Sequence, residues 1–312
     1  MNPAPHASPQ TKPRTDLETN PSASFHSAPR ANFRRAYGMA LAGAIGALIG
    51  LFWYVELVHT NNIWVRDCWA GIAIGGAIGF VLNAAEPFRD GAWLKLSRMG
   101  TWGGIAGAIG GAIGLLIGEF VLGGLRGGLL GRSISWSILG LGIGISQGLA
   151  HRSLQRLIFG VIGGATGGFI GGFLFEALRV ALAERFGYAP SQALGIVVLG
   201  AGLGLFLALV EQALRRAWLQ VLSGRQEGRI FLLTNRTSTI GLDERAHVGL
   251  FGDSQVARRH AEIIITSSGY ALCNRDAKAR TRVNGTQLSG ERILADGDKI
   301  ELGGTRLVFH KR

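Results

Sequence analysis

Cysteine is nearly absent from this chain, which carries two in 312 residues. Cys68 and Cys273 are too few for a disulfide framework, and neither has a Cys or His partner at metal-ligand spacing. No nucleophile elbow or other catalytic constellation occurs either. We therefore predict a protein that is not an enzyme and that needs neither a metal nor another cofactor.

Acidic residues are also scarce, with 20 Asp and Glu against 32 Lys and Arg, which gives a formal net charge of +12. The arginines gather at the ends of apolar stretches and do not follow one face of a helix. This placement favours contact with anionic lipid headgroups over a nucleic-acid partner. We expect the lipid bilayer as a partner and no nucleic acid.

Glycine, by contrast, is abundant: there are 49, in a chain that is 47% hydrophobic and shows no Gly-X-Y repeat. Transmembrane helices tolerate glycine at this density better than soluble helices do. Six apolar stretches are long enough, or nearly so, for the roughly 20 residues that cross about 30 Å of hydrocarbon. They cover residues 36–58, 65–85, 99–122, 133–150, 157–182 and 193–213.

The polar segment before these stretches, residues 1–33, is rich in Pro, Ser and Ala and is predicted to be a disordered cytoplasmic tail. Residues 34–224 form the predicted six-helix membrane domain. Arg and Lys are more frequent in alternate loops, beginning with the segment before the first span, which places both termini in the cytoplasm. An even number of spans gives the same result, in a cell inner or plasma membrane.

Glycines recur at four-residue spacing within the spans, as at Gly71, Gly75 and Gly79, so they share one helix face. Close backbone approach at such faces is how helices associate in lipid, where no hydrophobic force drives them together. Similar endings of the first, third and fifth spans, near Glu56, Glu119 and Glu176, indicate three tandem helical hairpins.

The sequence pattern changes after Arg229. From there on, short strand-like runs alternate with turn signals such as Asn284-Gly285 and Asp296-Gly297-Asp298. Strands are expected near residues 230–233, 238–242, 260–266, 270–274, 280–284, 298–302 and 305–310. Short strands separated by such turns are typical of an all-β sandwich, which we place at residues 225–312.

Four islands in this region, within residues 229–310, resemble the forkhead-associated (FHA) family. They are Thr239-Ile240-Gly241-Leu242, Val256-Ala257-Arg258-Arg259-His260-Ala261, Thr281-Arg282-Val283-Asn284-Gly285, and Leu294-Ala295-Asp296-Gly297-Asp298-Lys299-Ile300. The resemblance implies a sandwich whose loops at one end bind phosphothreonine peptides. It also implies scaffold roles for Gly241, His260 and Gly285.

The residues that the family uses to bind phosphate differ here. Leu242 replaces an arginine, Ala257 replaces a serine, and Lys278-Ala279 replaces a Ser/Thr-Asn pair. Either neighbouring residues supply the charge and hydroxyl that a dianionic phosphate needs, or the domain docks partners without phosphate. The candidate peptide-binding residues are Arg245, Ser254, Arg258, Lys278, Arg280 and Asn284.

Two functions follow from these features. The first is a membrane-anchored scaffold or adaptor whose FHA-like domain recruits a phosphorylated or unphosphorylated cytoplasmic protein in signalling, such as a Ser/Thr kinase substrate. The second is a transporter or channel that its cytosolic FHA-like domain regulates. Polar groups along a central path would favour transport, whereas an apolar bundle packed on glycine would favour the scaffold.

Overall fold

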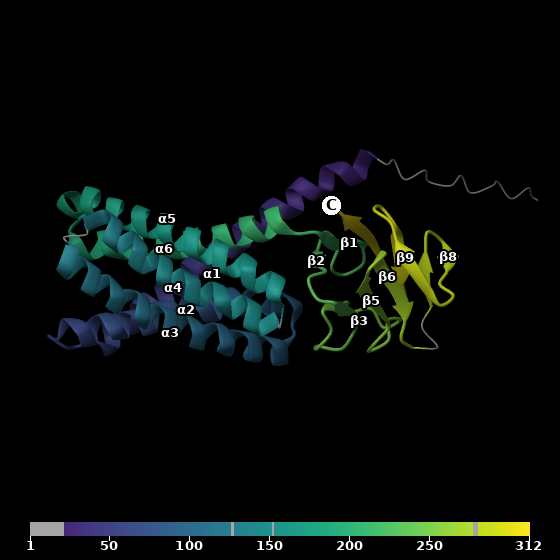
Figure 1. The fold of residues 1–312 in the computed structure, drawn as a ribbon, viewed down its shortest axis with the longest axis horizontal. Coiled ribbons are helices and arrows are strands. Elements are labelled where there is room, and N and C mark those ends of the chain that lie inside the picture. The colour runs from purple at the N-terminus through teal and green to yellow at the C-terminus, as the bar shows by residue number, and fades with distance from the viewer. Residues whose placement is uncertain (1–21, 126–127, 152, 277–279) are drawn as a thin grey trace, which may run out of the picture.

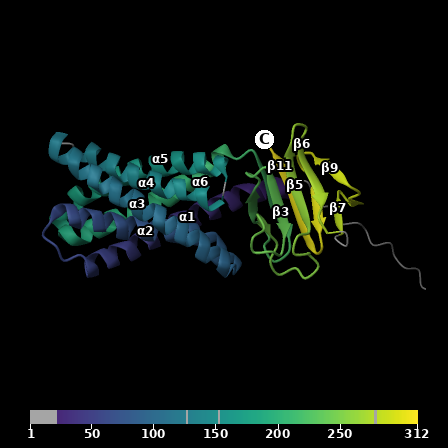
Figure 2. The same cartoon turned by 60° about the horizontal axis from the view of Figure 1, so that its bottom comes forward.

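The computed structural model describes residues 22–125, 128–151, 153–276 and 280–312. A helical bundle occupies one end of the long axis and a β-sandwich the other (Figure 1). The helices run along that axis, whereas the strands run across it (Figure 2). This arrangement matches the predicted class of a helical membrane bundle followed by an all-β domain.

Six helices in the described residues are long and apolar enough to cross a membrane. They are α1 (Ser22–Leu57), α2 (Ile63–Asp90), α3 (Trp93–Leu125), α4 (Gly128–His151), α5 (Leu154–Phe186) and α6 (Tyr188–Leu214). Each helix packs against its neighbours in the chain, and α6 closes the ring by packing against α1. Large apolar side chains cover the outside of the ring, including Phe52, Trp102 and Phe120, as a lipid-facing surface requires.

Glycine contacts hold this ring together. Between α2 and α3, Gly71 meets Gly111, Gly75 meets Gly107, and Gly79 meets Gly103. Between α4 and α5, Gly140 meets Gly164 and Gly144 meets Gly160, while Gly200 of α6 meets Gly43 of α1. A Cβ at Gly75 would collide with the Gly107 carbonyl oxygen, so these backbones approach as only glycine permits. Glycine–glycine contacts thus join α2 to α3, α4 to α5 and α6 to α1. This recurrence, once for every two helices, agrees with three tandem hairpins.

Apolar side chains fill the centre of the ring. Ile78, Leu139, Ile143, Leu199 and Leu203 are fully buried there, in one cluster that includes residues of every helix except α3. A polar pair lies inside as well: the Asn83 amide donates to Ser146 Oγ at 3.0 Å. The interior is therefore mainly a packed apolar core that includes one interhelical polar pair, in which the Asn83 Oδ1 atom accepts no hydrogen bond.

Two sheets form the sandwich. The strands are β1 (Ala217–Ser223), β2 (Ile230–Leu232), β3 (Thr237–Gly241), β4 (Val248–Gly249), β5 (Ala261–Thr266), β6 (Gly269–Asn274), β7 (Thr281–Val283), β8 (Thr286–Gln287), β9 (Glu291–Leu294), β10 (Lys299–Leu302) and β11 (Thr305–Lys311). One sheet has the order β2-β1-β11-β10-β7-β8 and the other β4-β3-β5-β6-β9. Their inner faces enclose a core that includes Leu219, Ile240, Leu272, Ile300 and Phe309, each fully buried.

The domain limits differ from those expected. The sandwich was expected from residue 225, but β1 precedes that position and lies between β2 and β11. β1 starts at Ala217, and only Arg215 and Arg216 separate it from the end of α6 at Leu214. Of the predicted disordered tail, residues 22–33 belong to α1, because extending a formed helix requires no new nucleus. Residues 1–21 lie outside the described residues.

Candidate functional site

Two loops, the β3–β4 and β4–β5 connections, meet at one end of the sandwich, where β6 also ends. Gly241, the last residue of β3, is so close to the Arg258 carbonyl that no Cβ would fit. The Leu242 amide then donates to the Ala257 carbonyl at 3.1 Å, and the next amide donates to the Arg258 carbonyl. Backbone bonds therefore fix the first loop to the second.

His260 anchors the second loop, which is the β4–β5 connection. Its side chain is buried, and Nδ1 accepts a hydrogen bond from the Ala257 amide at 3.1 Å. An accepting Nδ1 carries no proton, and burial also lowers the pKa of His260, so the ring is neutral at physiological pH. The scaffold role that the family resemblance implies for His260 stays a prediction.

Asp253 fixes the second loop to the β10–β11 turn. Its carboxylate accepts hydrogen bonds from the Gly304 amide at 2.9 Å and from Thr305 Oγ1 at 2.8 Å. Partial burial raises the pKa of Asp253, but these bonds and one from the Gln255 amide outweigh it, so the net shift is downward. The lowered pKa keeps the carboxylate ionised, and these hydrogen bonds in place, to a lower pH than for an ordinary aspartate.

Exposed polar side chains gather around this end. Ser254 follows Asp253, and Arg280 precedes Thr281, which pairs with Leu302 at the end of β10 beside the same turn. Arg258 is exposed on the loop that contacts Gly241. Three of the predicted peptide ligands, Ser254, Arg258 and Arg280, therefore lie at one end of the sandwich, where two cations and a hydroxyl can receive an anionic group.

Leu242 has a different role from the arginine it replaces. Its side chain is half-buried and packs against the sandwich core, so it turns away from the loop surface. Ala257 adds no hydroxyl to the neighbouring loop. Any phosphate bound here would need ligands other than those two positions.

The other predicted ligands lie elsewhere. Arg245 lines a cavity between the sandwich and the helix ends. Asn284 occupies the left-handed first position of the β7–β8 turn, followed by Gly285, also at positive φ. Its side chain donates to Asp298 Oδ1 at 2.8 Å and accepts from the Lys299 amide at 2.9 Å, at the opposite end of β7 from Arg280. Lys278 lies outside the described residues.

Contacts with the bundle set the position of the sandwich. Arg229 forms a two-pronged ion pair with Asp90, the last residue of α2. Thr234, in the β2–β3 loop, contacts the start of α5: its hydroxyl accepts from Arg156 Nε at 3.2 Å, and its carbonyl accepts from Ser153 Oγ at 3.3 Å. The sequence placed arginines near these helix ends but gave no sign of their partners.

Cations predominate around this junction. Burial lowers the pKa of Arg229, nearby Arg35 and Arg89 lower it further, and Glu86 acts in the opposite direction. The pKa of His247 is lowered by burial and by Lys95 and Arg156. The junction between bundle and sandwich is therefore a region of positive potential. Among the described residues, no group of three or more His, Cys, Asp or Glu could hold a metal ion.

Comparison with known proteins assigns the sandwich to a class. Residues 220–312 match the family model described as the inner membrane component of T3SS, cytoplasmic domain. The segment is also similar to an FHA domain studied for phosphothreonine-dependent interactions, with 31% identity over 31% of this chain and 97% of that one, at a TM-score of 0.29. No curated protein matches the chain.

Two further solved structures are similar over the same segment. The FhaA FHA domain, solved with the intracellular domain of a second protein, shares 32% identity over 30% of this chain and 99% of that one, with a TM-score of 0.28. An FHA domain from Chlamydia trachomatis shares 26% identity over 31% and 98%, with a TM-score of 0.29. The family model and the FHA domains match the same segment, about 30% of the chain, so the recognised part of the chain is its C-terminal FHA-like domain. FHA domains are interaction modules, and this one follows a bundle of membrane helices.

Proposed function

We propose that this protein is a non-enzymatic membrane-anchored adaptor, whose FHA domain recruits a cytoplasmic protein by binding a phosphorylated segment of it. One observation carries the proposal: exposed Ser254, Arg258 and Arg280 lie at the loop end of a sandwich fixed to the helices. A phosphate with two negative charges needs such convergent cations and a hydroxyl donor. In this proposal, Arg258 and Arg280 supply the positive charge that the FHA family usually has at the position of Leu242.

The bundle supports an anchoring role over transport. Its centre is filled by apolar side chains, and its helices touch through glycine. The carboxylates near the outer ends of three spans do not share one environment. Glu176 is buried and bound by Arg179 at 2.5 Å and by Arg132 at 3.5 Å, whereas Glu56 is exposed. This pattern favours structural ion pairs over a cation-binding ring.

The proposed orientation places both termini in the cytoplasm of a cell whose inner or plasma membrane contains the bundle. The excess of arginine and lysine on the sandwich side supports it. A short tag fused to Arg312 should be accessible to protease in inverted membrane vesicles and protected in right-side-out ones. The opposite pattern would refute the orientation and, with it, recruitment of a cytoplasmic partner.

Binding of phosphopeptides tests the adaptor function. The full chain in detergent should capture phosphothreonine peptides from a library and lose them after phosphatase treatment. The double variant Arg258→Gln, Arg280→Gln should bind them at least ten-fold more weakly, since each charged hydrogen bond contributes about 1.5–3 kcal/mol. Arg282→Gln is the matched control, because Arg282 is an exposed arginine two residues further along the chain from Arg280.

Two outcomes would contradict the phosphate requirement. Equal capture of phosphorylated and unphosphorylated peptides would instead identify a docking module that does not need phosphate. An equal loss in the Arg282→Gln control would show that binding depends on net charge and not on the loop end.

A further inference from the structure

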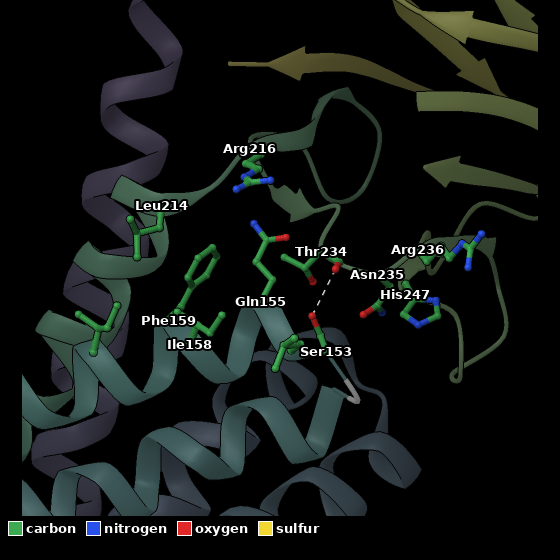
Figure 3. A pocket seen from close by; sticks show the side chains of 12 residues that line it. Ser153, Gln155, Ile158, Phe159, Leu214, Arg216, Thr234, Asn235, Arg236 and His247 are labelled. Atoms are coloured by element: carbon green, nitrogen blue, oxygen red, sulfur yellow. Dashed lines mark hydrogen bonds between the residues drawn. The ribbon is translucent and has the colours of Figure 1, made fainter. Parts of the chain in front are cut away.

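A groove of about 870 Å³ lies where α5 begins, α6 ends and the sandwich rests on both. Figure 3 shows its lining, with α5 below and the β2–β3 loop beside it. The lining residues are Ser153, Leu154, Gln155, Ile158, Phe159, Ile162, Leu214, Arg216, Thr234, Asn235, Arg236 and His247. Nothing in the proposed adaptor function uses this groove.

The membrane side of the groove is apolar. Leu154, Ile158 and Ile162 are spaced by four residues and form one face of α5, and 74%, 46% and 42% of their surfaces are exposed. Leu214, at the end of α6, forms the opposite wall and is also exposed. The face from Leu154 to Ile162 is about 12 Å long, close to the depth of one hydrocarbon leaflet at about 15 Å. An acyl chain therefore matches this face in length and polarity.

The sandwich side of the groove is polar and positive. Arg216 lies in the connection from α6 to β1, while Arg236 and His247 come from loops of the sandwich (Figure 3). Asn235 and Gln155 add hydrogen-bonding groups between them. None of the twelve lining residues is acidic, so the charge of this wall is not balanced within the lining.

We propose that this groove binds one anionic phospholipid, with an acyl chain along α5 and the headgroup phosphate at the positive wall to which Arg216 and Arg236 contribute. The apolar floor and the cationic wall meet where the helices leave the bilayer, which is the level of lipid headgroups. Planar guanidinium groups suit phosphate oxygens, and Arg216 and Arg236 bring two of them to the lining from different elements. The bound lipid contacts both bundle and sandwich and so joins them.

Native mass spectrometry of the full chain tests the proposal. The protein in detergent is titrated with phosphatidylglycerol or with phosphatidylcholine of the same acyl chains. We expect one tightly bound phosphatidylglycerol and a preference for it over phosphatidylcholine. The variant Arg216→Gln, Arg236→Gln should lose that preference by about five-fold per arginine, or about 25-fold for the pair.

Matched variants separate the site from general charge and from folding. Arg282→Gln with Lys299→Gln removes two exposed charges elsewhere on the sandwich and should keep the lipid preference. Ile158→Trp should block the groove and weaken phosphatidylglycerol binding while all basic groups remain. Far-ultraviolet circular dichroism on each variant checks that it has folded; if the double variant fails to fold, Ile158→Trp and the single variant Arg236→Gln carry the test.

Three results would overturn the proposal. Equal binding of the two lipids to the wild-type chain would leave only an apolar groove. Competition by soluble glycerol phosphate at the concentrations of the lipid would indicate a free phosphate ligand without a chain. Equal losses in the groove variants and the Arg282 and Lys299 control would mean adsorption by net charge alone.

Discussion

The ion pair between Asp90 and Arg229 is expected to hold the sandwich against the bundle, and Arg229→Ala should release it. Asp90 is the last residue of α2, and its side chain is 5% exposed, whereas that of Arg229 is 23% exposed. A carboxylate at a helix C-terminus is disfavoured by the helix dipole, so Asp90 depends strongly on its cation. Removing the arginine leaves a buried charge without its partner.

The magnitude follows from the degree of burial. Fully buried pairs cost about 3–5 kcal/mol when one partner is removed, and exposed pairs contribute about 1 kcal/mol or less. Because Arg229 keeps some solvent contact, we expect a loss of about 2 kcal/mol of docking free energy. At 1.4 kcal/mol per factor of ten, the undocked fraction should rise about 30-fold.

Thiol labelling measures that fraction. With Cys68 and Cys273 replaced by serine, a cysteine at Leu232 reports on docking, because Leu232 is buried and lines the cavity between the sandwich and the helix ends. Its labelling rate should rise about 30-fold in Arg229→Ala, in proportion to the undocked fraction. Asp90→Asn with Arg229→Gln should give a smaller rise, since no unpaired charge remains.

An adjacent arginine supplies the control. Arg89 is exposed, and its Nε donates to the Ala85 carbonyl at 3.2 Å, so Arg89→Ala removes a charge without unpairing Asp90. Unchanged labelling in Arg229→Ala, or an equal rise in Arg89→Ala, would refute the reasoning.

Glycine packing, acid sensitivity and the altered phosphate pocket give the remaining predictions. Gly75→Ala should lower the Tm in detergent, because its Cβ would collide with Gly107 and cost about 1–3 kcal/mol of stability. Gly76 has room for a Cβ, so Gly76→Ala should change the Tm little, and equal losses in the two variants would contradict this reasoning. The folded-state pKa of Asp253 is lowered, so its stabilisation is present above the unfolded pKa of about 3.9 and is lost as the pH falls through the lower folded value. Asp253→Asn should therefore unfold more easily in urea at pH 7 and approach the wild type near pH 3, whereas an undiminished deficit there would count against the ionised form. Leu242→Arg should bind a phosphothreonine peptide about ten-fold tighter by calorimetry, at some cost in core packing, and unchanged affinity would place the phosphate elsewhere.

Most of the architecture could be predicted from local patterns. The six apolar stretches lie within or near the six helices, and the expected strands match β2, β3, β5, β6, β7, β10 and β11 to within about two residues. The strands that were missed are β1, β4, β8 and β9. Two of these have only two residues, too few to show a period, and β1 lies before residue 225, where the sandwich was expected to begin.

The candidate site was less predictable. The motifs indicated which loops to inspect, and Ser254, Arg258 and Arg280 do lie at one end of the sandwich. The same motifs could not distinguish these three residues from Asn284 and Arg245. Asn284 stabilises a turn at the other end of the sandwich, and Arg245 lines the cavity beside the helix ends. A motif identifies which position of the chain to consider, whereas the direction in which that side chain points depends on how its loop packs.

Local sequence patterns by themselves indicated that this chain has membrane-spanning helices and a β-sandwich. Hydrocarbon imposes a length and polarity on each segment separately, and turns punctuate strands locally, so both are written in short stretches of sequence. Tertiary structure alone decided that the helices close into a ring, that Leu242 turns into the core, and that Arg229 meets Asp90 across 139 positions of the chain. Those outcomes depend on contacts between distant residues, which no local pattern specifies.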